Sequence, residues 1–588
     1  MKSSKEKKTK GFFNNVLASA IGFVLGIFMF FGSIFIFIIV VALIGSIFDS
    51  SGKIEPETIV KMKFDYPITD KPNNDPFMNF DLLSEFEPNN SKHLYKVLNS
   101  IKTAGENENI SGMLLDLRGF QSPGMASIKE IRDALKQFKQ KDKFIYAYST
   151  YFNKSSYYLA SVSDSIFMYP TGMLELSGLS STTPFFTETM SEIGIKPEII
   201  RHGKFKAAVE PFMLTEMSEE NREQTEMLLT DIWTSMLVDI SESRNITIDN
   251  LNKIADDLVL SMLPDKPIET GLIDKLIYPD ELNDLLAEKT NQEDDIELFS
   301  IFDLIDEENK SKNKIAIIYA EGGIDGDPNN IHSDYTKTIK KVFENEDIDA
   351  VVFRVNSPGG SALISDEILT QMKLSKHEKP IVVSMGNYAA SGGYYISCAA
   401  DKILASSNTI TGSIGVFGLF FTAEELLTEK MKLHYDNVKT NKFSNLGEVH
   451  RSLSEEEKSI IQLSIKNTYN EFINHVSTAR NLTIKEVDAI GQGRVWTGLR
   501  AEKIGLVDSI GGLNDAIQTA AQLASLEDFN IVEYPKSKNG LESIISDLES
   551  AKKLKGQSIE EIYLNQLKNK FLNMQGIQAR LPIEYKLD

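Results

Sequence analysis

The chain has 588 residues, 42% of them hydrophobic and 25% charged, which is ordinary for a globular protein of two to four domains. Its net charge of −22 argues against nucleic acid as a partner, because nucleic-acid binding needs clustered Lys and Arg. The single cysteine, Cys398, excludes an intrachain disulfide, and its small neighbours predict that it packs in the core.

The first 48 residues predict a membrane anchor. A lysine-rich arm at residues 1–15 precedes an uncharged apolar stretch at residues 16–48. That stretch is longer than the roughly 7–15 residues of a signal-peptide core and exceeds the about 20 residues that a spanning helix needs. No A-x-A-like cleavage site follows it. By the positive-inside rule, the lysines predict a cytoplasmic N-terminus and place the rest of the chain across the membrane.

After the anchor, strand and helix patterns alternate. Residues 59–68 have a strand pattern, and the acidic stretch at 71–90, with its Asn and Pro residues, indicates a loop. The other elements predicted in this half are helices at 93–104 and 127–138, strands at 110–119 and 143–149, and a helix that starts near residue 157. Strands that alternate with helices are typical of parallel βαβ units, so we predict an α/β fold.

The same order of patterns returns in the second half. It comprises strands at 314–324, 349–357 and 379–385, and helices at 334–345, 366–375 and from residue 392 onward. Each half closes with a long helix, at 218–244 and 454–480. Both helices open with Ser followed by Glu residues, as a helix cap does.

These patterns divide the chain after the anchor into four parts. Two repeats occupy residues 55–285 and 313–535, and an acidic, solvated connector at 286–312 joins them. Residues 536–588 have no counterpart in the other half. We expect them to form a helical extension of mixed charge, and we assign it no role.

Matching residues in the two halves are separated by a nearly constant offset. The offset is 237 from Asp164 to Asp401 and 236 from Arg244 to Arg480. Small loop insertions produce such a drift, and self-similarity over this length indicates duplicated domains.

The two halves differ at two positions that bear chemistry. Ser391 of the second half stands where Lys154 stands in the first, and Lys206 of the first half stands where Ser444 stands in the second. A serine kept in one copy and a lysine kept in the other predict one Ser–Lys active site divided between the two repeats. Lys154 and Ser444 are then expected to be dispensable for chemistry.

A serine nucleophile needs a base to remove its proton. None of the seven histidines lies in a glycine-rich turn, although His202 is close to Lys206 in sequence and is the alternative base. A lysine serves if burial in an apolar site lowers its pKa from about 10.4 toward neutrality. Apart from the lysine itself, the segment at 205–209, Phe-Lys-Ala-Ala-Val, is apolar and suits that role.

The serine end of the site has small residues and a helix start. Ser391 lies in Ala-Ala-Ser-Gly-Gly at 389–393, directly before an apolar helix, so the N–H of Gly392 can face an anion at the helix N-terminus. A second oxyanion donor is expected from the Asn-Ser-Pro-Gly-Gly turn at 356–360.

Four motifs resemble those of signal peptide peptidase A in its long, two-repeat, membrane-anchored form. They are SPGG at 357–360, AASGGYY at 389–395, TGSIGVFG at 411–418 and KAAVEPF at 206–212. The resemblance runs through residues 55–535 and includes the anchor. It implies that Ser391 is the nucleophile and Lys206 the general base.

The same resemblance implies roles for four further residues. Ser413 would hydrogen-bond the lysine and position it. Gly392, with Gly359 or Gly360, would form the oxyanion hole. No metal or organic cofactor is implied.

The resemblance also implies a crotonase/ClpP-like α/β fold in each repeat and a bowl-like homotetramer. The substrates would be remnant signal peptides and other apolar peptides, cut beside the bilayer that residues 16–48 span. A bacterial inner membrane is the expected location, with the catalytic part on the periplasmic or extracytoplasmic side.

Two other readings remain open from the residues alone. Crotonase-type acyl-CoA hydratases and hydrolases share the glycine turns, but an anchored external domain has poor access to CoA, and the serine at 391 has no part there. A non-catalytic membrane scaffold would have no reason to keep both Ser391 and Lys206 in their motifs.

Overall fold

The computed structural model describes residues 54–72, 91–263, 265–291, 298–304, 310–327, 330–535 and 576–581, together with residues 26, 29–33 and 36. These residues belong to two units, Met1–Pro56 and Glu57–Asp588. In the first unit, residues 29–33 are helical. The predicted anchor at 16–48 otherwise lies outside the described residues, and no helix within the described part is long and apolar enough to cross a membrane.

The first repeat is built on a six-stranded parallel sheet in the order β8-β6-β5-β4-β1-β9. Its strands are β1 (Thr58–Lys63), β4 (Ile110–Asp116), β5 (Phe144–Phe152), β6 (Ser165–Leu174), β8 (Lys275–Leu276) and β9 (Phe299–Ser300). The helices are α2 (Leu94–Glu106), α3 (Met125–Lys139), α4 (Lys154–Ala160), α5 (Thr187–Ile193), α6 (Glu219–Arg244), α7 (Ile248–Asp256), α8 (Val259–Met262), α9 (Lys266–Glu269) and α10 (Pro279–Thr290). Short elements are β2 (Ile68–Thr69), β3 (Lys92–His93) and the 3-10 turns η1 (Ala207–Phe212) and η2 (Ile301–Asp303).

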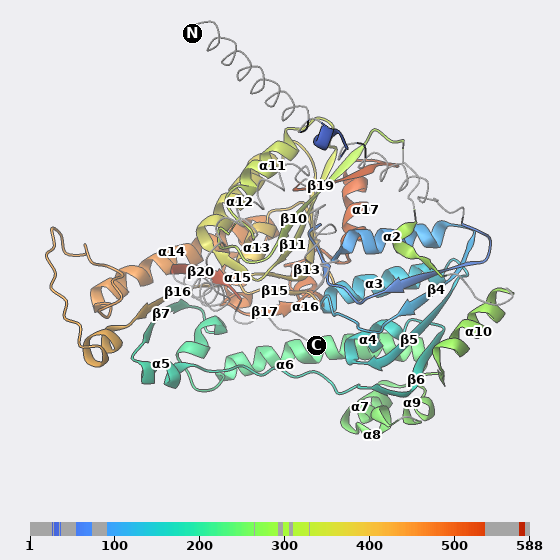
Figure 1. Cartoon of the computed structure of the whole chain (residues 1–588). Helices are drawn as coiled ribbons and strands as arrows, with labels where there is room; N and C mark the ends of the chain where they lie inside the picture. The colour runs from blue at the N-terminus through green and yellow to red at the C-terminus, as the bar shows by residue number, and fades with distance from the viewer. Residues whose placement is uncertain are drawn as a thin grey trace, which may run out of the picture. The chain divides into compact units, whose positions relative to one another are not determined.

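The second repeat has the same plan, with the sheet order β17-β15-β13-β11-β10-β19 (Figure 1). In addition, β14 pairs with β13, and β18 pairs with β14. Its strands are β10 (Lys314–Glu321), β11 (Ala350–Ser357), β13 (Ile381–Ala390), β14 (Lys402–Ala405), β15 (Ile410–Gly412), β17 (Val495–Thr497), β18 (Ser509–Ile510) and β19 (Asn530–Tyr534). The helices are α11 (Tyr335–Phe343), α12 (Ala362–Ser375), α13 (Gly392–Ser397), α14 (Glu455–Arg480), α15 (Ile484–Ile490), α16 (Gly498–Lys503) and α17 (Leu513–Leu523), with a π-turn, η3 (Leu426–Lys430). The pairing is parallel except between β15 and β17.

A third sheet joins parts of the chain that are far apart in sequence. Its order is β12 (Gly359–Ser361), β20 (Gly576–Arg580), β16 (Val416–Thr422) and β7 (Lys196–His202). The strand β7 of the first repeat runs antiparallel to β16 of the second, from Val416↔His202 to Thr422↔Lys196. This pairing carries the segment after β7 into the second repeat, where the candidate site lies.

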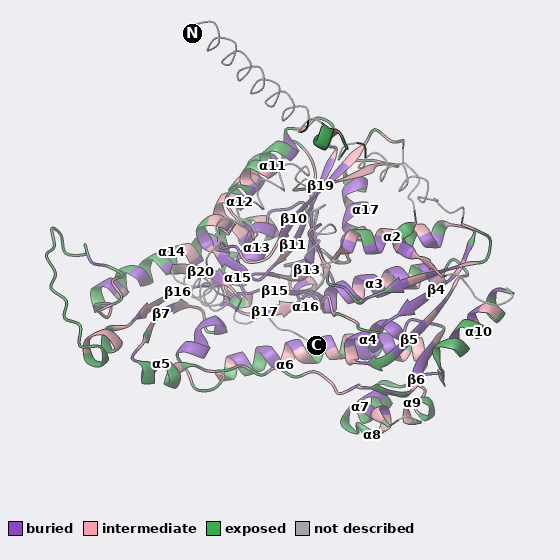
Figure 2. Ribbon diagram, in the orientation of Figure 1, coloured by how far each residue is buried: buried purple, intermediate pink, exposed green. Residues whose placement is uncertain are grey.

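The cores follow from the sequence pattern of the strands. β10 and β11 are nearly continuous apolar runs, as expected for parallel strands covered on both faces, and their central residues are fully buried. Figure 2 shows the sheets buried and the exposed residues on the outer helices. The long helices α6 and α14 begin as predicted, because the hydroxyl oxygens of Ser218 and Ser454 accept from the backbone N–H groups of the first turn.

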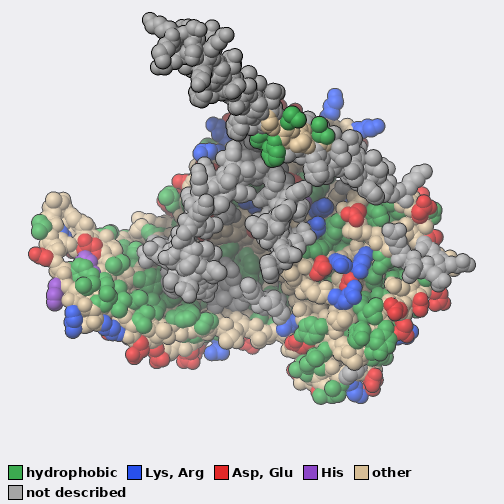
Figure 3. Space-filling model, in the orientation of Figure 1, with side chains coloured by type: hydrophobic (Ala, Val, Ile, Leu, Met, Phe, Trp, Pro, Cys, Tyr) green, Lys and Arg blue, Asp and Glu red, His purple; other side chains and the backbone are tan. Residues whose placement is uncertain are grey.

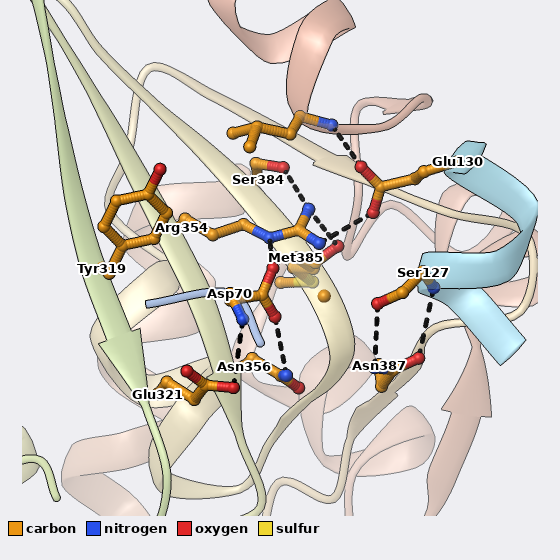
Figure 4. A network of polar contacts seen from close by, with 12 residues as sticks. Asp70, Ser127, Glu130, Tyr319, Glu321, Arg354, Asn356, Ser384, Met385 and Asn387 are labelled. Atoms are coloured by element: carbon orange, nitrogen blue, oxygen red, sulfur yellow. Dashed lines mark hydrogen bonds and ion pairs between the residues drawn. The ribbon is translucent and has the colours of Figure 1, made fainter. Parts of the chain in front are cut away.

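A buried ionic network ties the two repeats together (Figure 4). Arg354 on β11 donates from Nε to Asp70 Oδ1 at 2.7 Å and from Nη2 to Glu130 Oε1 at 2.8 Å. Both carboxylates belong to the first repeat, and all three side chains are buried. The other Glu130 oxygen accepts from the N–H of Leu513 at 2.7 Å. Burial, partly opposed by Arg354, raises the pKa of Glu130.

Several element boundaries differ from the sequence prediction. The helix predicted at 366–375 starts at Ala362, because Ser361 caps it from the end of β12. The predicted connector at 286–312 contains regular structure among its described residues: α10 extends to Thr290, and β9 adds a strand beside β1. In the extension at 536–588, predicted to be helical, the described residues 576–580 form the strand β20. They pair with β12 and β16, which local helical patterning could not anticipate.

Candidate active site

The structure brings Lys206 and Ser391 into contact, although 185 residues separate them in sequence. Lys206 Nζ lies 2.7 Å from Ser391 Oγ. The lysine follows β7 and directly precedes η1, and the serine stands between β13 and α13. Both side chains are fully buried. The two residues that the sequence paired across the repeats are therefore within hydrogen-bonding distance.

The backbone of Ser391 is strained. Its φ of 56° and ψ of −112° lie outside the regions that L-residues commonly occupy. Such strain persists only where the surroundings fix it, and it is concentrated at functional sites. Here the serine N–H donates to Gly412 O at 2.8 Å, and its carbonyl accepts from Tyr395 N at 2.8 Å as α13 begins. A sharp strand-to-helix turn of this kind presents the hydroxyl, as nucleophile elbows do.

Lys206 is enclosed without a counter-charge. No carboxylate in the described part of the chain forms an ion pair with it, and burial lowers its pKa well below the ordinary value. Two glycines make the enclosure possible. A methyl group at Gly493 would lie 2.7 Å from Lys206 Cα, and one at Gly415 would lie 3.3 Å from its Cδ. The sequence analysis did not identify the Gly-Gln-Gly run at 491–493 as part of the site. Its pair of closely spaced glycines is the signal that could have identified it.

Ser413 is the third polar group at the lysine. Its Oγ lies 3.0 Å from Lys206 Nζ, and its carbonyl oxygen lies 3.2 Å from the same nitrogen. The Ser413 N–H donates to Arg494 O at 2.7 Å, which holds this residue at its positive φ of 51°. Lys206 thus has three oxygen neighbours, two of them from Ser413.

A buried carboxylate beyond the lysine was not anticipated from the sequence. Glu210, in η1, accepts from Ser218 Oγ at 2.6 Å and from Asn221 Nδ2 at 2.9 Å. Both partners belong to the start of α6, so Glu210 fixes the 3-10 turn against that helix. Its signal in the sequence is a lone acidic residue within an apolar segment, four positions after Lys206.

The glycine turn at 357–360 lies against the serine turn. A methyl group at Gly359 would lie 2.7 Å from the backbone nitrogen of Gly392. Gly359 and Gly360 both have φ values in the range that disfavours a side chain, 94° and 157°. The predicted oxyanion residues are therefore neighbours.

The network of Figure 4 supports this turn. Asn356, the residue before it, donates from Nδ2 to Asp70 Oδ2 at 2.7 Å and accepts at Oδ1 from Tyr388 N at 3.1 Å. The amide links the glycine turn to β13, which leads to Ser391. Asp70 also lies near Glu321. Burial and the negative charge of Asp70 raise the pKa of Glu321 to about 7.

The other residues weighed from the sequence lie elsewhere. The His202 ring packs on Tyr469 with centroids 4.2 Å apart, and Ser444 is exposed and bonds to Asn441. Lys154 is half-buried at the first position of α4. Cys398 is buried as predicted, and burial raises its pKa to about 12.

The described residues hold no group of three or more His, Cys, Asp or Glu side chains arranged to bind a metal ion.

Comparison with known proteins places the chain in a family. The model of peptidase family S49 matches twice, at residues 137–293 and 373–527. Protease 4 of Salmonella typhi is 33% identical over 475 residues, covering 77% of this chain and 76% of the relative. Protease 4 of Haemophilus influenzae is 34% identical over 483 residues, covering 77% and 78%. A putative signal peptide peptidase SppA of Enterococcus faecium is 36% identical over 215 residues, covering 36% and 62%.

The two family matches fall one in each repeat, in agreement with the duplication inferred from the constant offset. The long relatives match across both repeats. The chain belongs to peptidase family S49 and is a two-repeat protease of the SppA type.

Proposed function

We propose that this protein is a membrane-anchored serine endopeptidase that hydrolyses apolar peptides, among them the signal peptides left in the membrane after their release. Ser391 is the nucleophile and Lys206 the general base. The observation that carries the proposal is the 2.7 Å contact between Lys206 Nζ and Ser391 Oγ in a buried site.

The lowered pKa of Lys206 supports its role as base. A buried lysine without a counter-charge favours the neutral amine, which can accept the serine proton. Ser391 Oγ then attacks the scissile carbonyl carbon, and the lysine returns the proton to the leaving amine. Ser413 orients the amine through its hydroxyl and carbonyl oxygens. Water subsequently hydrolyses the ester, with the lysine again as base.

The oxyanion of the tetrahedral intermediate is assigned to the N–H of Gly392 and to the turn at Gly359 and Gly360. Their proximity supports this assignment, and one such donor contributes about 10²–10³ in rate. No metal or organic cofactor takes part in these steps.

Two substitutions test the dyad in the full chain, with hydrolysis of an apolar peptide as the readout. Ser391→Ala and Lys206→Ala are each expected to lower kcat by about 10⁴-fold or more, because members of a catalytic unit act together. The matched controls are Lys154→Ala and Ser444→Ala at the corresponding positions of the other repeat, which should keep wild-type rates. Activity retained in Lys206→Ala would reject the dyad. Inhibition by a metal chelator would instead indicate a metallopeptidase.

The substrate and location rest on the sequence. The apolar stretch at 16–48 would hold the protease at a bacterial inner membrane, with the N-terminus cytoplasmic and the catalytic part outside. Signal peptides left in the bilayer would then lie beside it. Protease added outside intact spheroplasts should digest the catalytic part and spare the lysine-rich arm. Protection of the catalytic part would reverse the proposed topology.

Self-association is proposed from the strand pairing between repeats. β7 of the first repeat pairs with β16 of the second. At an offset of 237, residues 433–439 correspond to β7 and residues 179–185 correspond to β16. Neither segment belongs to a strand in the described structure. Residues 433–439 are exposed, and Figure 3 shows hydrophobic side chains on the arm that carries them, at the left of the view.

We therefore propose that 433–439 of one copy pairs with 179–185 of the next, which would close a ring such as the expected homotetramer. The substitution Tyr435→Pro removes a backbone N–H donor from this arm. It should reduce the mass of the assembly that light scattering measures. An unchanged mass would contradict this pairing.

A further inference from the structure

The loop at residues 491–494, between α15 and β17, closes over Lys206. A methyl group at Gly493 would lie 2.7 Å from the backbone nitrogen, the Cα and the Cβ of that lysine, so the main chain passes directly against it. Gln492 O also accepts from the N–H of Phe205, the residue before the lysine, at 3.0 Å. The loop therefore forms one wall of the enclosure around the candidate base.

The same loop holds Ser413. Arg494 O accepts from Ser413 N at 2.7 Å, and Gly493 N donates to Ile414 O at 2.7 Å. Ser413 contributes two of the oxygen atoms that lie around Lys206 Nζ. A shift of the loop would therefore displace one wall of the enclosure and two polar neighbours of the amine together.

The loop has a conformation that its own residues do not favour. Gln492 has a positive φ of 54°, which is uncommon for a residue with a side chain. The surroundings also pack tightly on it: a methyl group at Gly203 would lie 2.4 Å from Gln492 O, and one at Gly415 would lie 2.7 Å from Gly493 Cα. Contacts from outside the loop must stabilise such a conformation.

Tyr469 on α14 and Asp488 on α15 supply contacts of this kind. Tyr469 OH donates to Asp488 Oδ1 at 2.6 Å and accepts from the N–H of Gln492 at 3.3 Å. Gln492 Nε2 donates to the same carboxylate oxygen at 2.7 Å. Tyr469 is fully enclosed, with 1% of its surface exposed. The three bonds close a triangle that fixes both the backbone and the side chain of Gln492.

The ring of Tyr469 also contacts the strand that leads to the lysine. The His202 ring, at the end of β7, packs on it with centroids 4.2 Å apart. Burial lowers the pKa of His202; the charge of Asp488 opposes this shift, and that of Lys466 adds to it. The imidazole is therefore neutral at pH 7. Tyr469 thus connects the strand before Lys206 with the loop that covers it.

The first repeat keeps an equivalent pair without this loop. Trp233 Nε1 on α6 donates to Asn252 Oδ1 on α7 at 3.0 Å. At an offset of 236, these two residues correspond to Tyr469 and Asp488. In place of Gly-Gln-Gly the first repeat has Ala-Asp-Asp at 255–257. Both repeats therefore use an aromatic–polar pair between two helices, and in the second repeat the pair also holds the loop over Lys206.

We propose that Tyr469 and Asp488 are positioning residues for the general base, which hold the loop at 491–494 closed over Lys206. This inference rests on the proposed function. The two residues act through Gln492, whose neighbour in the loop lies against the lysine. Burial is what lowers the pKa of Lys206, so a loop that opens and admits water should raise that pKa.

Charged side chains near Lys206 are paired with one another. Arg201 lies 3.6 Å from Glu210, and Arg494 lies 2.7 Å from Glu223. Arg201 also donates from Nη1 to Lys206 O at 3.4 Å. Substitutions in the pair of positioning residues leave all of these side chains in the chain.

The acid limb of kcat/KM measures the effect, because it reports the ionisation of the base in the free enzyme. Tyr469→Phe in the full chain removes the hydroxyl and keeps the ring on His202. The pH at which kcat/KM for an apolar peptide is half-maximal should rise by about one unit, a fraction of the 3–5 units that full burial can cause. At pH values below both midpoints kcat/KM should fall about 10-fold, and above them it should approach the wild-type value.

Denaturant titration supplies a readout that does not depend on catalysis. A higher pKa of Lys206 in the folded chain narrows the pH window in which unfolding takes up a proton. Between pH 7 and 10, the free energy of unfolding should therefore rise less in Tyr469→Phe than in wild type.

Two substitutions at Asp488 separate the hydrogen bonds from the charge. Asp488→Ala removes the acceptor and should raise the midpoint as Tyr469→Phe does. Loss of the negative charge would by itself lower the midpoint, because a nearby anion favours the ammonium form of lysine. Asp488→Asn keeps an acceptor oxygen and should leave the midpoint at or below the wild-type value. Asn252→Ala, the corresponding change in the first repeat, is the matched control and should leave the midpoint unchanged.

The outcomes separate this inference from the proposed function. Wild-type midpoints in both Tyr469→Phe and Asp488→Ala would overturn the positioning role, even if both variants lost activity uniformly at every pH. An equal shift in Asn252→Ala would also overturn it, because the effect would not depend on the loop at 491–494. The proposed function fails separately, if Lys206→Ala keeps the wild-type pH profile, whatever the Tyr469 variant shows.

Discussion

The two repeats share their internal framework and differ at the candidate active site. Tyr157 OH donates to Leu272 O at 2.9 Å in the first repeat, and Tyr394 OH donates to Leu506 O at 2.9 Å in the second. Asp164 accepts from the N–H of a strand residue, Ile145, as Asp401 does from Ile381. These bonds sit at equivalent positions, so the duplication preserved the contacts that hold helix and sheet together.

The two repeats differ at the helix that follows β5 in the first repeat and β13 in the second. In the first repeat, Asn153 caps α4 with an ordinary extended backbone, and Lys154 begins the helix. In the second, Ser391 holds a strained conformation before Gly392. The segment after β7 differs in the opposite sense, because Lys206 is buried and Ser444 is exposed. Each repeat has thus lost one member of the Ser–Lys pair. The fold tolerates both losses because the two remaining residues, Lys206 and Ser391, meet at one site.

The largest expected effect on stability comes from the buried ionic network of Arg354, Asp70 and Glu130, which joins the two repeats. Arg354→Met leaves Asp70 and Glu130 buried without their cation, which should cost about 3–5 kcal/mol of unfolding free energy. Denaturant titration of the full chain measures it. The control is Arg118→Met. The Arg118 side chain is 43% exposed, and Asp116 keeps its second cation, Lys61, so the lost ion pair is worth about 0–1 kcal/mol. Equal losses in the two variants would show that the network does not join the repeats energetically.

The glycine turns of the two repeats give the next contrast. Gly359→Ala would put a methyl group 2.2 Å from Ala579 O and 2.7 Å from Gly392 N, and should lower kcat by about 10²–10³-fold. In the corresponding turn after β4, a methyl group at Gly119 meets nothing closer than 3.6 Å. Gly119→Ala should keep wild-type kcat and lose only about 1 kcal/mol of stability to its positive φ. Normal kcat in Gly359→Ala would remove this turn from the oxyanion hole.

A third contrast separates positioning from chemistry. Glu210 is buried and holds η1 on α6, whereas its counterpart Glu448 is a surface residue near His450. Glu210→Gln should misplace Lys206 and lower kcat by up to about 10²-fold, with little change in KM. Glu448→Gln should leave both constants unchanged. If Glu210 acts only on stability, kcat per folded molecule will stay at the wild-type value.

The smallest expected effect is a pH dependence of stability. Burial lowers the pKa of Lys206 in the folded chain, so the unfolded chain binds more protons between that value and about 10.5. The free energy of unfolding should therefore rise with pH across this window. Lys206→Met removes the effect: it should be more stable than wild type at pH 7, by a margin that shrinks toward pH 10.

The matched variant for that experiment is Lys154→Met. It leaves Lys206 in place and should retain the pH dependence of wild type. A margin between Lys206→Met and wild type that stays constant from pH 7 to 10 would show that Lys206 is not held as a neutral amine.

Much of the fold could be predicted because its signals are local. Apolar strand runs, helix caps such as Ser218 and Ser454, and the constant offset all lie in short windows of sequence. The boundaries failed where a distant partner decides them. Ser361 starts α12 early because it ends a strand that pairs with β20, and residues 299–300 become a strand because β1 offers them an edge.

The candidate site was predictable in its residues and not in its surroundings. Ser391, Lys206, Ser413 and the glycine turns stand in motifs, so the sequence names them. Glu210 and Gly493 were missed because their parts in the site depend on burial against residues far away in the chain. The segment at 576–581 was missed for the same reason, since no pattern within it specifies the two edges that it joins.

The sequence by itself determined the duplication, the α/β class and the choice of Ser391 and Lys206 as candidates, because these depend on residue type and short-range periodicity. Only the tertiary structure decided that β7 pairs with β16, that Lys206 reaches Ser391 with no ion-paired carboxylate among the described residues, and that the distant strand β20 pairs with β12. Strand edges and buried volumes belong to the whole fold, so contacts between residues 185 positions apart are fixed only when the chain is packed.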